Sequence, residues 1–258
     1  MLIDTHVHLD AAEFDADRPA VIAAARKAGV AGFVVPAVAR SNFAAVLALA
    51  AANQDIYPAL GIHPLYVDGV AEGDLAQLDY LLATAPVVAV GEIGLDHFVA
   101  GLDRAAQQAL FVAQLELACK HRLPVILHVR RAVDAVIACL RRTRPEAGGI
   151  AHAFNGSRQQ AEQLIGLGFK LGFGGTLSDP GSRRIRELAA SLPLESMVLE
   201  TDAPDMAPLW ARGERNEPAN IASYASILAG LRNTDVASVI RVTGDNARAV
   251  LRLPQQQG

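Results

Sequence analysis

The chain of 258 residues has few aromatic residues, few cysteines and no long apolar run. Phe, Trp and Tyr make up only 5% of it, so any hydrophobic core has to be aliphatic. Its two cysteines, Cys119 and Cys139, form no Cys-x-x-Cys pair and indicate free thiols in a reducing cytoplasm. Apolar runs such as Phe33–Val38 are shorter than the about 20 residues of a membrane span, and the N-terminus does not resemble a signal peptide. We therefore expect a soluble, cytoplasmic protein.

Charge of one sign is also scarce. Lys and Arg number 23 and Asp and Glu number 27, which gives a net charge of −4. No overall basic field would attract nucleic acid, so binding of a polyanion has to be local. Hydrophobic residues make up 52%, which excludes a disordered chain. No linker or internal repeat divides the sequence, so we expect one domain over residues 1–258, without an obligate protein partner.

Short apolar runs alternate with helical patterns from end to end. The clearest helical pattern covers Asp103–Lys120, with Asp103 as a candidate N-cap. The runs predicted as buried strands are Leu2–Val7, Gly32–Val38, Ile56–Ile62, Val87–Ile93, Pro124–Val129, Gly149–Ala153, Lys170–Phe173 and Met197–Thr201. Eight such units predict an α/β fold, a (β/α)8 TIM barrel. Strand counting alone leaves an open, doubly wound sheet as the alternative.

Histidines and carboxylates gather where the predicted strands end. These residues are His6, His8, His63, Glu92, His128, His152 and Asp202. In a barrel the carboxyl ends of the strands meet on one face, where active sites lie. Residues two apart on a strand point the same way, so the imidazoles of His6 and His8 would both face inward as a chelating pair.

The side chains at these strand ends form a nitrogen and oxygen ligand set without thiolate. Without His63, the set has four imidazoles and two carboxylates, which are too many for one tetrahedral zinc with an open position. They match two divalent metal ions that share a bridging group. Imidazole with carboxylate favours Zn, Mn, Co, Ni or Fe over Mg. Such a pair lowers the pKa of bound water and supplies a hydroxide nucleophile near neutral pH.

The candidate ligands belong to motifs that extend along almost the whole chain. They are Asp4-Thr5-His6-Val7-His8-Leu9-Asp10, Gly61-Ile62-His63-Pro64, Gly91-Glu92-Ile93-Gly94-Leu95-Asp96, Leu123-Pro124-Val125-Ile126-Leu127-His128, His152-Ala153-Phe154-Asn155-Gly156-Ser157, Glu200-Thr201-Asp202-Ala203-Pro204 and Arg215-Asn216-Glu217-Pro218. These motifs and their order resemble the TatD family of metal-dependent deoxyribonucleases, which belongs to the amidohydrolase-like barrels. The resemblance implies a binuclear site at the C-terminal face of the barrel. One metal would be held by His6, His8 and Asp202 and the other by His128 and His152, with Glu92 bridging.

Further residues have candidate roles in catalysis or substrate binding. Asp202 can also accept the proton of the attacking water. Glu200 is either a base or a residue that orients a ligand histidine. His63 resembles a family histidine near the leaving group or phosphate, with a structural hydrogen bond as the alternative. Arg130 points to the same side as His128 and resembles a family arginine, which implies contact with a phosphate.

The sequence leaves two alternative roles for each of two further features. The run Gly172–Gly175 ends the seventh predicted strand, where it is either a phosphate-binding loop or a tight turn. His97 stands where the family usually has a non-ligand residue, and it is either a substrate contact or a surface histidine.

The resemblance implies a nuclease that hydrolyses phosphodiester bonds of DNA with a metal-activated water. The alternative enzyme is an amidohydrolase-like hydrolase of a small ester, lactone or amide, to which the acidic net charge is suited. A non-catalytic, metal-binding barrel that acts as a binding module is the alternative from another class. It predicts that some of the candidate metal ligands are replaced by other residues, whereas all six are present.

Overall fold

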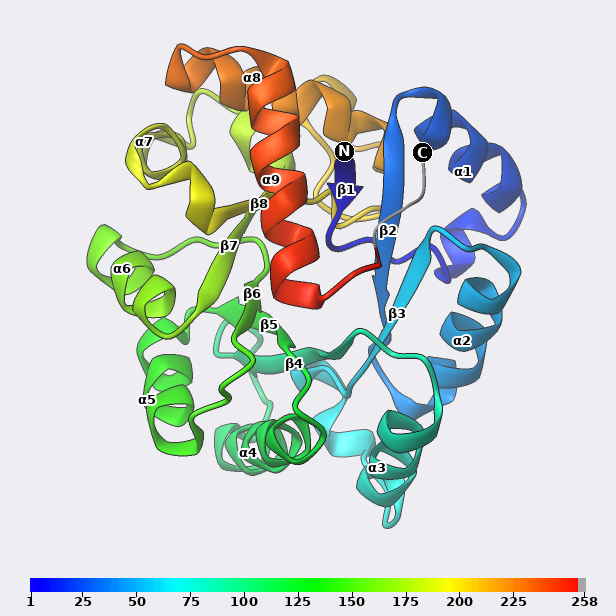
Figure 1. The fold of residues 1–258 in the computed structure, drawn as a ribbon. Coiled ribbons are helices and arrows are strands. Elements are labelled where there is room, and N and C mark those ends of the chain that lie inside the picture. Colours follow the sequence, from blue (N-terminus) through cyan, green and yellow to red (C-terminus); the bar gives the residue numbers. More distant parts are fainter. Residues whose placement is uncertain (255–258) are drawn as a thin grey trace.

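A barrel of eight parallel strands forms the centre of the part that the computed structural model describes, residues 1–254 (Figure 1). The strands are β1 (Leu2–Asp4), β2 (Val30–Pro36), β3 (Ile56–Leu60), β4 (Ala89–Asp96), β5 (Val125–Arg130), β6 (Gly149–Ala151), β7 (Phe169–Phe173) and β8 (Met197–Leu199). Each strand pairs with the next one in the sequence. Beyond the strand ends, backbone hydrogen bonds from Thr5 to Leu199 and from Asp202 to His6 join β8 to β1. This order confirms the (β/α)8 barrel and excludes the open doubly wound sheet, in which the strand order reverses.

Helices follow the strands and surround the barrel (Figure 1). They are α1 (Arg18–Lys27), α2 (Phe43–Ala52), α3 (Asp74–Thr84), α4 (Arg104–His121), α5 (Val133–Thr143), α6 (Arg158–Gly166), α7 (Arg183–Ser191), α8 (Ile221–Arg232) and α9 (Val236–Leu251). Asp103 caps α4 as predicted, because its carboxylate accepts the backbone N–H groups of Ala105 and Ala106. Within residues 1–254, none of the helices combines the length and the apolar character needed to cross a membrane.

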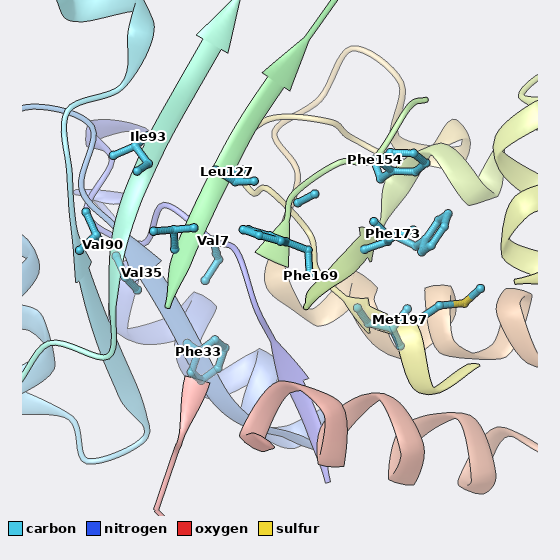
Figure 2. Packing of buried hydrophobic residues seen from close by; sticks show 14 of the residues in the cluster. Val7, Phe33, Val35, Val90, Ile93, Leu127, Phe154, Phe169, Phe173 and Met197 are labelled. Carbon is cyan, nitrogen blue, oxygen red and sulfur yellow. The ribbon is translucent and has the colours of Figure 1, made fainter. Parts of the chain in front are cut away.

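The hydrophobic core has two layers, and both are mainly aliphatic. The larger one packs the outward side chains of the strands against the helices, and Figure 2 shows part of it, including Phe33, Leu127, Phe173 and Met197. The smaller one fills the barrel interior with residues such as Ile126 and is closed by side chains of α9. Figure 1 shows α9 crossing this end of the barrel, and Asn246 on α9 donates to the carbonyl of Met197 at the start of β8. The amino end of the barrel is therefore covered.

The ends of β1 and β4 differ from the prediction by three residues each, and the ends of the other strands differ from it by at most two. Strand β1 ends at Asp4, before His6, because the His6 N–H turns to the Asp4 carboxylate at 3.3 Å. Beyond it the chain still bonds alternately to both neighbours, from Thr5 to Leu199 and from Val7 to Val34. Strand β4 continues to Asp96, past the predicted end at Ile93. This extension brings Asp96 to the same level as the end of β5.

Candidate metal centre

The six predicted ligands come together at the carboxyl end of the barrel, around the carboxylate of Glu92. Its Oε2 lies 3.2 Å from His6 Nε2 and 3.7 Å from His8 Nε2. Its Oε1 lies 2.9 Å from His128 Nδ1 and 3.8 Å from His152 Nε2. The two oxygens of Glu92 thus face two different pairs of histidines.

The first group has the dimensions of a tetrahedral metal site. His6 Nε2 lies 3.2 Å from His8 Nε2, and Asp202 Oδ1 lies 3.6 Å and 3.5 Å from these two nitrogens. Ligands about 2.0–2.2 Å from a zinc ion lie about 3.3–3.6 Å apart in a tetrahedron. The separations among these atoms and Glu92 Oε2 agree with that spacing, so a divalent ion fits between them.

The second group is fixed by two further carboxylates. Asp96 Oδ2 lies 3.1 Å from His128 Nε2, and Glu200 Oε1 lies 3.1 Å from His152 Nδ1. The N–H of a neutral ring donates a hydrogen bond to the carboxylate oxygen that it faces, so the lone pair of the ring sits on the other nitrogen. His128 Nδ1 and His152 Nε2 are therefore the atoms available for a metal, and both face Glu92 Oε1.

The carboxylate of Glu200 is buried behind His152. Its Oε1 also accepts the backbone N–H of Ala153 at 2.5 Å. Asp202 lines the open cleft above the barrel, but Glu200 does not line it within residues 1–254. This position agrees with a residue that orients His152 and not with a base that contacts water in the cleft.

The glycines at the end of β7 make room for Glu200 and Met206. A Cβ at Gly172 would lie 2.1 Å from Glu200 Oε2, and one at Gly174 would lie 2.6 Å from the Glu200 carbonyl oxygen. A Cβ at Gly175 would lie 2.2 Å from the Met206 carbonyl oxygen. Close packing against these residues therefore accounts for the glycine run.

His63 lies beside Glu92, but its hydrogen bonding makes it a donor. Its Nδ1 accepts the Leu65 N–H at 3.1 Å, so the proton of the neutral ring is on Nε2. Burial lowers the pKa of His63 to about 3, which keeps the ring neutral. Nε2 lies 3.6 Å from Glu92 Oε1 and belongs to a group that could hold a metal with His128. Because Nε2 carries the proton, we favour a hydrogen-bond donor at this position over a third ligand.

The site contains more buried negative charge than the protein's own cations balance. Four carboxylates lie in it, of which Asp202 is half-buried and the others are buried, and none forms an ion pair with Lys or Arg among residues 1–254: Glu92, Asp96, Glu200 and Asp202. Burying unpaired charge is costly, so such a cluster requires cations. The donor types, the spacing and this excess of charge together fit divalent metal ions.

The pKa values of the histidines follow from this charge. Burial alone would lower the pKa of His8, but the hydrogen bond and charge of Asp202 outweigh burial and raise it to about 9. Burial is likewise outweighed at His152, where Asp202 and Glu200 raise the pKa to about 10. Burial would raise the pKa of Glu92, but interactions with His6, His63 and His128 outweigh burial and hold it well below its usual range. Protons thus bind where the metal ligands are expected.

Two buried carboxylates of the site were not predicted as functional. Asp96 faces Nε2 of His128. The sequence signal that could have identified it is its place after Gly94-Leu95 in a motif, but the predicted strand ended before this position. Asp4 accepts the hydroxyl of Thr201 at 2.5 Å, and burial raises its pKa to about 8. It lies in the same motif as His6, but nothing in its spacing distinguishes it from a surface residue.

An open cleft of about 1480 Å³ lies over the metal centre. It is larger than the about 300–1,000 Å³ typical of small-molecule pockets. Arg130, predicted to bind substrate, lines it together with Arg131 and Arg184. His97 also lines it, and burial lowers the pKa of its ring.

Comparison with known proteins gives a consistent result. The family model described as "TatD related DNase" matches residues 3–252. The "Uncharacterized metal-dependent hydrolase YjjV" of Escherichia coli is 41% identical, over 98% of both chains. The "3'-5' ssDNA/RNA exonuclease TatD" of Edwardsiella piscicida is 36% identical, over 98% of this chain and 100% of its own. The crystal structure of YjjV, a TatD homologue, superposes with a TM-score of 0.95 over 98% of each chain.

Proposed function

The chain belongs to the family of TatD-related DNases, and from this premise we propose that it hydrolyses phosphodiester bonds in single-stranded nucleic acid with two divalent metal ions. The position of Glu92 is the main support. One of its oxygens lies 3.2 Å from His6 and the other 2.9 Å from His128, as expected of a bridging carboxylate. A relative named as a single-strand DNA and RNA exonuclease supports the substrate class.

We assign the ligands by the direction of their free atoms. His6 Nε2, His8 Nε2, Asp202 and Glu92 Oε2 would hold one ion, and His128 Nδ1, His152 Nε2 and Glu92 Oε1 the other. Imidazole with carboxylate suits Zn, Mn, Co, Ni or Fe better than Mg. Two such ions lower the pKa of bound water and offset the negative charge that develops on phosphoryl oxygens.

The residues around the ions supply the proton transfer and the positioning. Neighbouring His152 and His8 hold the pKa of Asp202 below its usual value, in spite of burial, so the carboxylate is ionised at neutral pH and can accept the proton of the attacking water. Neutral His63 donates from Nε2 to an oxygen of the substrate phosphate or of the leaving group. Arg130, exposed in the cleft, contributes positive charge for phosphate.

The size of the cleft favours an oligonucleotide over a small ester, lactone or amide. With the amino end of the barrel covered by α9, the substrate has to approach the ions from the carboxyl end. Cytoplasmic location, the single domain and the absence of an obligate partner stay predictions from the sequence.

The test is a cleavage assay with 5′- and 3′-labelled single strands. The protein is stripped of metal and then supplied with Mn²⁺ or Zn²⁺. We expect cleavage only with metal and a stepwise product ladder for one of the two labels. Glu92→Gln is the control, and it should lose the activity. Turnover of a lactone or carboxylester without metal-dependent cleavage of either strand would contradict the proposal.

A further inference from the structure

Two arginines stack on one exposed phenylalanine at the rim of the cleft. The guanidinium carbon of Arg130 lies 3.8 Å from the centroid of the Phe98 ring, and that of Arg131 lies 4.6 Å from it. Phe98 is 45% exposed, and all three side chains line the cleft over the metal centre. Arg130 ends β5 and Phe98 follows β4, so two neighbouring strands present this cluster.

The two guanidinium groups have no counter-charge of their own. Within residues 1–254 neither forms an ion pair or a side-chain hydrogen bond, unlike Arg215 or Arg26, which bind carboxylates. Two like charges that share one ring repel each other, and the stacking itself contributes little at an exposed position. An anion bound between them would remove this repulsion and use donors that are now free.

Hydrogen bonds from the backbone to the carboxylate of Asp96 fix this cluster relative to the metal centre. Asp96 accepts the N–H groups of Phe98 and Val99 at 2.8 and 3.0 Å with Oδ1, while its Oδ2 faces His128. Arg131 has a left-handed φ of 54°, a conformation that non-glycine residues adopt at a cost of about 1–2 kcal/mol. The same carboxylate therefore positions a metal ligand and the loop that carries Phe98.

We propose that Arg131 and Phe98, next to Arg130, form a second anion subsite that binds the phosphate flanking the scissile one. This inference rests on the proposed nuclease function and names the feature of the substrate that this chain selects, at least two neighbouring phosphates. Both planar guanidinium groups lie against the Phe98 ring, and their forked donors would face the nucleic-acid strand. Arg184, on the same cleft, is held by the side chain of Asn155 and does not take part.

The test compares an oligonucleotide with bis(p-nitrophenyl) phosphate, which has a single phosphate. Arg131→Gln removes the charge and keeps a long polar side chain. We expect kcat/KM for a single-stranded oligonucleotide to fall about 10-fold more than kcat/KM for the small diester, as for the loss of one charge-assisted contact. The negative slope of log kcat/KM against log salt concentration should become shallower by about 0.7, the value of one phosphate contact on a single strand.

Two further variants and a binding experiment complete the test. Arg142 is exposed on α5, and its side chain forms no hydrogen bond or ion pair among residues 1–254, so Arg142→Gln is the matched control. It should leave kcat/KM for both substrates and the salt slope as in the wild type. Phe98→Leu keeps apolar bulk but not the ring, so it should give a smaller loss in the same direction. Fluorescence anisotropy of a labelled oligonucleotide with metal-free protein should show the same weakening in Arg131→Gln.

The outcomes separate this inference from the proposed function. A wild-type protein that cleaves neither substrate with metal would contradict the nuclease proposal itself. A wild-type protein that cleaves both, with Arg131→Gln losing both equally or keeping the full salt slope, would overturn the second subsite alone.

Discussion

Asp96 holds Nε2 of His128 at 3.1 Å, and this contact turns Nδ1 of the same ring toward Glu92 at 2.9 Å. Glu200 does the equivalent for His152 from the opposite ring nitrogen. Each histidine proposed for the second metal therefore has its own orienting carboxylate, whereas Nδ1 of His6 is buried without a partner among residues 1–254. Hydrogen bonds of this kind fix the tautomer and raise the basicity of a ligand histidine.

Asp96→Asn should weaken binding of one of the two metal ions by about 10–100-fold. The N–H groups of Phe98 and Val99 would retain the amide oxygen, so the amide nitrogen would face His128 Nε2 and favour the wrong tautomer. Titration calorimetry with Zn²⁺ on metal-free protein measures both binding events. Two sites of unchanged affinity would contradict the orienting role.

Glu200→Gln and Glu200→Ala separate orientation from base catalysis. The glutamine oxygen can still accept from His152 Nδ1 and the Ala153 N–H, so we expect kcat within about tenfold of the wild type. Alanine leaves His152 Nδ1 without its acceptor, so Glu200→Ala should lower kcat further and should also weaken metal binding. A loss of about 10³-fold or more with glutamine, at unchanged metal affinity, would instead identify Glu200 as the base.

Gly172→Ala should destabilise the protein, because the new Cβ would lie 2.1 Å from Glu200 Oε2. Overpacking of this kind costs about 1–3 kcal/mol. Gly230→Ala, inside α8 with open space around it, is the matched control and should be neutral or stabilising by up to about 1 kcal/mol. Thermal unfolding of the two variants measures the difference. Equal melting temperatures would show that Glu200 moves aside without cost.

The metal-free protein should lose stability as the pH rises. The pKa values of His8 and His152 are raised to about 9 and about 10, so the stability that they contribute is full below pH 6.5 and is lost as the pH rises through these values. Burial raises the pKa of Asp4 from 3.8 to about 8, so this group adds a loss of stability as the pH rises between these two values.

Urea unfolding between pH 6.5 and pH 10 measures this effect. With Zn²⁺ in excess we expect a smaller decrease, because the ions replace the protons on the histidines. A free energy of unfolding that rises with pH in the metal-free protein would contradict the charge distribution described for the site.

The sequence predicts the eight strands and the convergence of the six candidate ligands, and the reason is physical. Buried parallel strands need short apolar runs, and ligands at strand ends stand out against them, as His128 does after Leu127. The sequence does not identify Asp4 or Asp96, because Asp96 faces His128 from the neighbouring strand and Asp4 binds Thr201 beyond β8, and contacts between strands leave no local pattern. Nor does it give the tautomer of His63, which depends on the N–H of Leu65 in the following turn.

Anomalous scattering from crystals grown with Zn²⁺ or Mn²⁺ tests whether Glu92 bridges two metal ions. We predict two ions about 3.5–4 Å apart, each in contact with one oxygen of Glu92. A single ion held by His6 and His8, with Oε1 of Glu92 still bonded only to His128, would contradict it.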